Sequence, residues 1–223
     1  MGITERKERE KEHRREEIID AAQTIFFQKG LQLATMDEIA EAAELSKGTL
    51  YLYYKSKEDL YLAVLARGMD ILYDMFSTVV AESEPIAKKI AHLLDAYLRY
   101  FKEQRNYFRM FFFFDNPQVH KQVSEEMLQA CATHNMKVWN IVIGLIREGI
   151  EEGVIDHSID PKQAAVILWA SSSGLMRQMD REDHYWSDVM GVNLEEALRR
   201  ANAMILASMM TEGAKTQFRE AVV

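Results

Sequence analysis

The polar side chains with the most informative spacing in this chain lie between residues 35 and 57. Ser46 is a favoured residue for capping a helix start, which predicts a short helix over residues 47–54. Leu50 and Tyr54 are four residues apart, so they share one face and would pack inward. The outer face then carries amine and hydroxyl groups that can donate to phosphates and base edges of a nucleic-acid duplex. The residues predicted to contact it are Thr35, Ser46, Lys47, Gly48, Thr49, Tyr51, Tyr53 and Lys57.

Two further helices must hold that short helix in place. Thr35 and Glu38 have the T-x-x-E spacing of a capping box, which predicts that the preceding helix begins there. Leu45 is expected as a buried plug in the turn between the two helices. Ser56 and Asp59 form a similar S-x-x-D pair, which predicts the start of a third helix. The arrangement is a helix-turn-helix, whose second helix suits a DNA groove.

This stretch resembles the TetR family of bacterial repressors, whose pattern runs T-x-x-x-I-A-x-x-A-G-V-S-x-G-T-L-Y-x-H-F-x-x-K-E. Glu44 departs from it where the family has Gly in the turn, and Tyr53 and Tyr54 replace the usual His and Phe. A non-Gly residue in a left-handed conformation costs roughly 1–2 kcal/mol, so we expect a strained or altered turn. The matching residues are Thr35, Ile39, Ala40, Ala43, Ser46 to Tyr51, Tyr53, Tyr54, Lys57 and Glu58.

The resemblance implies an all-α protein with an N-terminal three-helix DNA-binding head and a helical body. We expect a charged extension over residues 1–17, the helix-turn-helix domain over 16–60, and a ligand-binding and dimerisation domain over 61–223. The family dimerises through its last two long helices, which would here span residues 164–179 and 194–210, with small residues such as Ser172 and Gly174 allowing close approach.

The implied function is transcriptional regulation. A cytoplasmic homodimer would bind a palindromic double-stranded DNA operator and release it when a small apolar or amphipathic effector moves the helix over residues 57–82. Activation in place of repression fits the sequence equally well. The alternative is an all-α ligand carrier or enzyme that binds no operator.

Composition sets limits on these expectations. The net charge is −8, and residues 1–60 hold ten Lys and Arg against thirteen Asp and Glu, so any positive surface for DNA must be local. The hydrophobic share of 48% is ample for a core. Cys131 is the single cysteine and cannot form an internal disulfide. The first residues lack the apolar run of a signal peptide, and no segment reaches the roughly 18 apolar residues of a membrane span.

Helical periodicity runs through the whole chain, and no alternating apolar and polar run predicts a sheet. Residues 4–17 are almost all charged and predict either a solvated helical extension or an arm whose Arg14 or Arg15 reaches DNA. The other predicted helices span residues 16–29, 57–82, 86–104, 107–114, 119–152, 161–179 and 194–211.

Aromatic residues are concentrated in residues 97–114, and methionines supply adaptable apolar surface nearby. Four consecutive phenylalanines cannot all face one core from a single helix. They therefore fit either an ordinary core with a dimer contact or an apolar effector pocket. The residues predicted to line such a pocket are Tyr97, Phe101, Phe108, Phe111, Phe112, Trp139, Trp169 and Met176.

Enzyme motifs are absent from the sequence. It contains no G-x-G-x-x-G, P-loop, G-x-S-x-G or C-x-x-C pattern, so we predict no catalytic residue and no cofactor. Asp156, His157 and Asp160 share one segment, but a solvated loop explains them better than a metal site.

Overall fold

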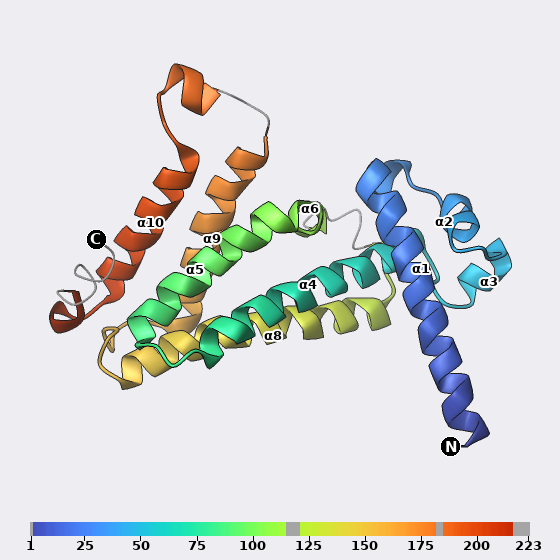
Figure 1. Cartoon of the computed structure of the whole chain (residues 1–223), viewed down its shortest axis with the longest axis horizontal. Helices are drawn as coiled ribbons and strands as arrows, with labels where there is room; N and C mark the ends of the chain where they lie inside the picture. The colour runs from blue at the N-terminus through green and yellow to red at the C-terminus, as the bar shows by residue number, and fades with distance from the viewer. Residues whose placement is uncertain (1, 115–120, 182–184, 216–223) are drawn as a thin grey trace. The chain divides into compact units, whose positions relative to one another are not determined.

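The computed structural model describes residues 2–114, 121–181 and 185–215 (Figure 1). Within these ranges every regular element is a helix, and β-type pairing is limited to an isolated bridge between Ile155 and Met210. The predicted all-α fold is therefore confirmed. The helices are α1 Ile3–Leu33, α2 Met36–Ala42, α3 Lys47–Tyr51, α4 Lys57–Ala81, α5 Ile86–Glu103, α6 Arg105–Phe114, α8 Glu125–Glu151, α9 Pro161–Asp180, a π-helix Tyr185–Val189, and α10 Leu194–Met209.

The chain divides into two compact units. The first comprises Met1–Ile71 and Gln104–Asn135, and the second comprises Leu72–Glu103 and Met136–Val223. Helices α4 and α8 each contribute to both units. The domain boundaries expected from the sequence, 16–60 and 61–223, remain a prediction.

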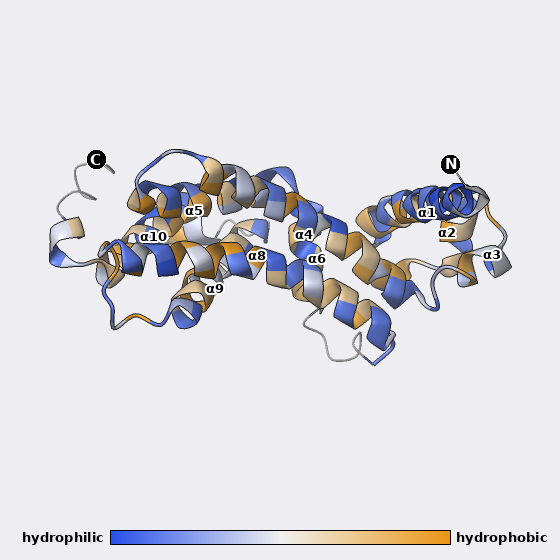
Figure 2. Cartoon of the chain, turned by 90° about the horizontal axis from the view of Figure 1, so that it is seen from below, coloured by the Kyte–Doolittle hydropathy of each residue, from blue (hydrophilic) through white to orange (hydrophobic). Residues whose placement is uncertain are grey.

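The first unit is built on α1, which joins the predicted charged extension and the first core helix into one element. Ile18 and Ala22 are completely buried on it, together with Ile39 of α2 and Leu50 of α3. Upstream of Ile18 the helix has no apolar face, and Figure 2 shows that part in hydrophilic colours. Gly30 ends the regular helix, because its φ of 70° is open to glycine and costly for other residues.

The second unit packs α9 against α10, with α5 beside α9. Pro161 opens α9, where a missing backbone N–H costs nothing, and the Asp160 side chain accepts from the Gln163 backbone N–H at 2.8 Å. Leu168, Leu198 and Leu206 fill the space between these helices. Burial of such side chains contributes about 1.5–3 kcal/mol each.

Candidate nucleic-acid interface

Helix α2 begins at the capping box predicted from the sequence. The Thr35 hydroxyl accepts from the Glu38 backbone N–H at 3.2 Å, and the Glu38 carboxylate accepts from the Thr35 backbone N–H at 3.1 Å. Lys29 of α1 donates to the same carboxylate at 2.5 Å. This bond and those to Thr35 hold the pKa of Glu38 below its usual value. Thr35 therefore has a capping role, and its proposed DNA contact is still untested.

In the turn after α2, Glu44 has the left-handed backbone conformation, at the position where the family pattern has glycine. Glu44 has a φ of 55°. The Leu45 N–H donates to the Ala40 carbonyl at 2.8 Å, and the Glu44 N–H donates to the Glu41 carbonyl at 3.0 Å. This pair of bonds is the Schellman motif, which ends a helix through one left-handed residue. The turn is therefore strained and not altered in shape, and the strain costs roughly 1–2 kcal/mol of stability.

Helix α3 is shorter than the sequence predicted. The Ser46 hydroxyl accepts from the Thr49 N–H at 3.1 Å and caps it, but the helix ends at Tyr51 instead of residue 54. The following N–H groups of Leu52 and Tyr53 bond to carbonyls three residues back, which tightens the chain into a turn.

The inner face of α3 is as predicted, whereas Thr49 and Tyr53 of the predicted outer face are half-buried. Leu50 and Tyr54 are buried, and burial raises the pKa of Tyr54 to about 12. Lys47 is exposed, and Tyr51 is 44% exposed. A Cβ added at Gly48 would meet only the Ser46 hydroxyl, at 3.9 Å. The backbone of α3 is therefore open to close approach at Gly48.

The lysines around α3 are already engaged with groups of this chain. Lys47 pairs with Asp37 of α2 at 2.7 Å, and the hydrogen bond from Lys47 to Asp37 raises the pKa of Lys47. Lys57 donates to the carbonyls of Leu31, Gln32 and Ala34 at 2.9, 3.3 and 3.1 Å. Lys57 thus closes the end of α1, a role that the sequence pattern did not indicate. A phosphate contact by Lys57 would require these bonds to break.

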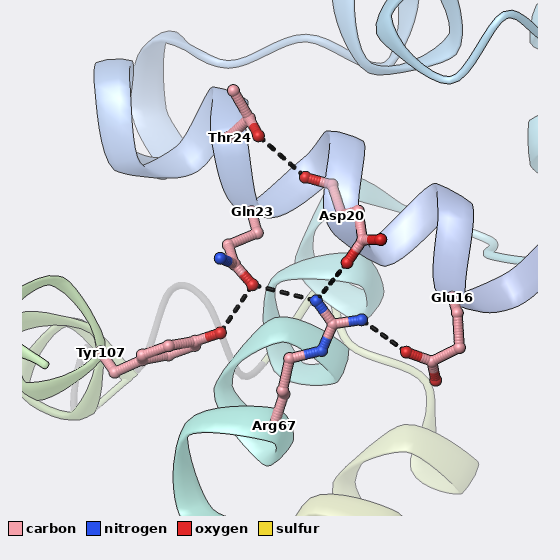
Figure 3. A network of polar contacts seen from close by, with 6 residues as sticks. All are labelled: Glu16, Asp20, Gln23, Thr24, Arg67 and Tyr107. Atoms are coloured by element: carbon pink, nitrogen blue, oxygen red, sulfur yellow. Dashed lines mark hydrogen bonds and ion pairs between the residues drawn. The ribbon is translucent and has the colours of Figure 1, made fainter. Parts of the chain in front are cut away.

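A polar network joins α1, α4 and α6 within the first unit (Figure 3). Arg67 of α4 donates to Glu16 at 2.5 Å, to Asp20 at 2.6 Å and to Gln23 at 3.0 Å. Tyr107 of α6 donates its hydroxyl to the same Gln23 oxygen at 2.6 Å. The Arg67 guanidinium, which has five donors in a fixed plane, therefore joins α4 to α1, and Gln23 links α6 to the same network.

Glycine allows the close approach of α6 to α4. A Cβ built at Gly68 would lie only 2.5 Å from Cδ1 of the Tyr107 ring. Any larger residue at position 68 would require the ring to move.

The start of α4 is also tied to the start of α8. The Ser56 hydroxyl accepts from the Asp59 N–H at 3.0 Å, which is half of the predicted capping box. The buried Asp59 carboxylate instead accepts from the Ser124 N–H at 2.7 Å. Sequence reasoning missed this contact, because no local spacing links residues 65 positions apart.

Five of the predicted effector residues lie in the second unit. Trp139 and Trp169 stack edge to face with ring centres 5.8 Å apart. The buried Tyr97 hydroxyl shares a 2.8 Å hydrogen bond with Ser173. Burial raises the pKa of Tyr97 to about 12, although hydrogen bonds with Ser173 and Trp169 act in the opposite direction. Phe101 and Met176 are also buried.

The three remaining effector candidates lie in the first unit, on α6. Phe108 is buried and contacts the half-buried Phe112 edge to face at 5.0 Å, and Phe111 is half-buried. The eight candidates thus fall into two groups on separate units. An open hollow of about 800 Å³ occurs elsewhere, beside the end of α9 and the start of α10. Its lining is Gln178, Met179, Arg181, Trp186, Ser187, Gly191, Val192, Asn193, Leu194 and Glu195.

Two of the three serines of α9, Ser172 and Ser173, are buried inside the chain. Ser172 is completely buried and donates to the Asn202 side chain of α10 at 2.9 Å, and Ser173 bonds to Tyr97. These small residues allow close packing inside the chain. Gly174, by contrast, is exposed, with open space where a Cβ would be.

The acidic loop after α8 has an internal role. Asp156 accepts from the backbone and hydroxyl of Ser158 at 2.9 and 2.7 Å. Among the described residues, no group of three or more His, Cys, Asp or Glu side chains is placed to hold a metal ion. Nor does any helix in those ranges have the length and apolarity to cross a membrane.

Two capped helices, a Schellman turn and a buried Leu50 behind an exposed face define α2 and α3 as a helix-turn-helix of the DNA-binding class. Residues 18–64 match the family described as "Bacterial regulatory proteins, tetR family". This match identifies residues 18–64 as a DNA-binding domain of the TetR family. That family consists of transcriptional regulators and not of enzymes.

The chain is similar to proteins with named regulatory roles. It is 31% identical over 116 residues to the transcriptional activator FasR of Mycolicibacterium smegmatis, covering 51% of this chain and 53% of that protein. It is 24% identical over 156 residues to the fatty acid metabolism regulator protein of Bacillus subtilis, covering 70% and 77%. The chain thus spans about half the length of FasR.

Solved structures show the same fold. FadR from Bacillus halodurans, a fatty acid degradation regulator, matches with a TM-score of 0.65 at 19% identity, covering 86% of this chain and 97% of that one. FadR from Bacillus subtilis in complex with stearoyl-CoA matches with a TM-score of 0.63 at 21% identity, covering 85% and 96%.

Proposed function

We propose that this chain is a transcriptional regulator that binds a double-stranded DNA operator through α3. The observation that carries the proposal is the exposed face of α3, where Lys47 and Tyr51 flank the open backbone at Gly48. Amines and hydroxyls at a major-groove helix fix its position on phosphates, while side chains at the helix start contact base edges.

Selection from random duplexes by the full chain tests this function. Thr49→Ala should change which bases are preferred, and each lost base contact should reduce the discrimination against the wrong base by about 1–3 kcal/mol. Tyr51→Phe should weaken all duplexes alike, because a phosphate contact carries no sequence information. Thr78→Ala is the matched control, since Thr78 is exposed on α4 and bonds only within its helix. If no duplex is enriched, a ligand carrier without an operator becomes the better interpretation.

We further propose an effector with a long apolar chain, such as an acyl thioester. Support comes from the relative in complex with stearoyl-CoA and from the ring cluster of Tyr97, Trp139 and Trp169 in the second unit. Burying about 300 Å² of apolar surface would contribute roughly 7 kcal/mol before entropy losses. The ligand would alter operator affinity only if it prefers one conformation of the protein.

Tryptophan fluorescence provides the effector test. Stearoyl-CoA should quench the Trp139 and Trp169 emission and lower operator affinity over the same concentration range. Coenzyme A without an acyl chain is the control and should do neither. If stearoyl-CoA binds without changing operator affinity, the site is not coupled to DNA binding, and if it does not bind, this effector class is wrong.

The protein is also proposed to act as a homodimer through α9 and α10. Val166 and Ile167 of α9 and Met204 of α10 are 50%, 53% and 67% exposed, an unusual amount of apolar surface for two neighbouring helices. Ile167→Asp should yield a monomer in sedimentation and weaken binding to a palindrome with half-sites about 34–36 Å apart. Unchanged sedimentation would place the interface on another surface.

Repression released by the effector is the proposed direction of control, although relatives include both activators and repressors. A reporter downstream of the selected operator should be silenced by the protein and restored by the effector. Silence in the absence of the protein would instead identify an activator. Because an operator lies on the chromosome, we propose a cytoplasmic location.

A further inference from the structure

The N-terminal part of α1 carries two rows of opposite charge. From Ile3 to Lys29 the helix keeps regular dihedrals, with the kink at Gly30. Residues spaced by three or four share a face, so eight of the charges form two neighbouring rows, although Arg14 and Arg15 also pair with Glu17 and Glu12. The basic row consists of Lys7, Lys11, Arg14 and Arg15. The acidic row consists of Glu5, Glu8, Glu12 and Glu16.

Each row continues, at helical spacing, into a later part of α1 whose side chains contact other helices of the first unit. Lys7, Lys11 and Arg14 continue at the same spacing into Ile18 and Ala22, which are completely buried in the head.

The acidic row ends at Glu16, which binds Arg67 of α4. Figure 1 shows α2 and α3 on one side of α1 and most of α4 on the other. The basic row therefore continues the face of α1 that is buried in the head, and the acidic row continues the face that binds Arg67.

Lys7 and Lys11 differ from the lysines of the head. Both are exposed, and neither makes an ion pair or side-chain hydrogen bond within the described residues. Lys29, Lys47 and Lys57 all bind groups of this chain. The extension thus supplies amines that can bind a phosphate without first breaking an internal bond.

We propose that the basic row of α1 binds the phosphate backbone of DNA flanking the operator half-site. The proposal rests on the operator function above and adds a second contact surface to it. Ile18 and Lys7 are eleven residues apart in one helix, or about 16 Å, which corresponds to roughly five base pairs. Charge complementarity selects this partner, because the row presents cations and few apolar atoms. The contact would be independent of base sequence.

The experiment compares two duplexes and two double variants of the full chain. One duplex carries the selected operator with ten flanking base pairs on each side, and the other ends at the half-sites. Lys7→Ala with Lys11→Ala removes the free amines, and Glu5→Gln with Glu8→Gln is the matched control on the opposite row. Binding is measured as a function of salt concentration, and circular dichroism checks that α1 remains helical.

On the long duplex the lysine variant should lose roughly two units of the slope of log K against log salt per protomer, and about tenfold in affinity at moderate salt. On the short duplex it should match the parent protein, and the glutamate control should keep the parent slope on both. Equal slopes for the parent and the lysine variant on the long duplex would overturn the proposal. Thr49→Ala separates the two hypotheses: if it changes base preference while the lysine variant keeps the parent slope on the long duplex, the operator function stands and the flanking contact fails.

Discussion

The helix-turn-helix and the α9–α10 pair of the second unit are stabilised in different ways. In the helix-turn-helix, short polar bonds from Thr35 and Ser46 fix where each helix begins, and few side chains are fully buried. In the α9–α10 pair, buried side chains such as Met176 and Leu198 fill the interior. The first region should therefore respond most to lost caps and charges, and the second to lost volume.

The largest expected effect sharpens that contrast in the second unit. Met176 is completely buried on α9, whereas Met190, before α10, is 53% exposed. Met176→Ala should lower the free energy of unfolding by about 2–5 kcal/mol, because the cavity and the lost transfer energy add. Met190→Ala should change it by less than about 0.5 kcal/mol. Chemical denaturation measures both, and similar values for the two would show that Met176 is not a packing residue.

Two lysines of the head should respond differently from each other. Lys57→Ala removes donors from three carbonyls and should destabilise the protein by about 1–3 kcal/mol. Lys47→Ala breaks only an exposed ion pair, so its stability should change by less than about 1 kcal/mol while operator affinity falls. Thermal unfolding and operator titration of both variants check this. A stable Lys57→Ala protein with impaired operator binding would restore Lys57 as a direct phosphate contact.

The turn after α2 offers a change in the stabilising direction. Glu44→Gly removes the left-handed strain and should raise the free energy of unfolding by about 0.5–1 kcal/mol, after allowance for the greater entropy of the unfolded chain. Glu41→Gly is the control, because Glu41 lies within regular α2 and glycine there should cost about 0.5–1 kcal/mol. Two shifts of the same sign would contradict the assigned turn geometry.

The smallest effect concerns Asp37, which holds the Lys47 amine. Asp37→Asn should tighten operator binding several-fold at low salt. In this variant Lys47 can bind a phosphate without first breaking its ion pair with the Asp37 carboxylate. Glu41→Gln changes the same charge on the same helix without a described partner, and it should have a smaller effect. Equal gains from both variants would reflect net charge alone and not the pair.

Local spacing was sufficient to predict the all-α fold and the starts of α2, α3 and α4, whereas α1 begins at Ile3 and not at the predicted residue 16. T-x-x-E gave the Thr35 cap, Ser46 gave the start of α3, and the family pattern identified the left-handed residue at position 44. These features depend on residues a few positions apart. The roles of Lys57, Asp59 and Ser172 depend on partners 23 to 65 positions away, so periodicity could not reveal them. The division of the aromatic residues between two units is of the same long-range kind.

The contact between Gly68 and Tyr107 has a consequence for how this sequence can diverge. Position 68 can accept a side chain only if the ring at position 107 shrinks or shifts, since the Cβ and Cδ1 positions are 2.5 Å apart. Replacing Tyr107 would in turn remove the hydroxyl that binds Gln23 of α1. In descendants of this chain, positions 23, 68 and 107 should therefore be substituted as a group, and single changes among them should be rare.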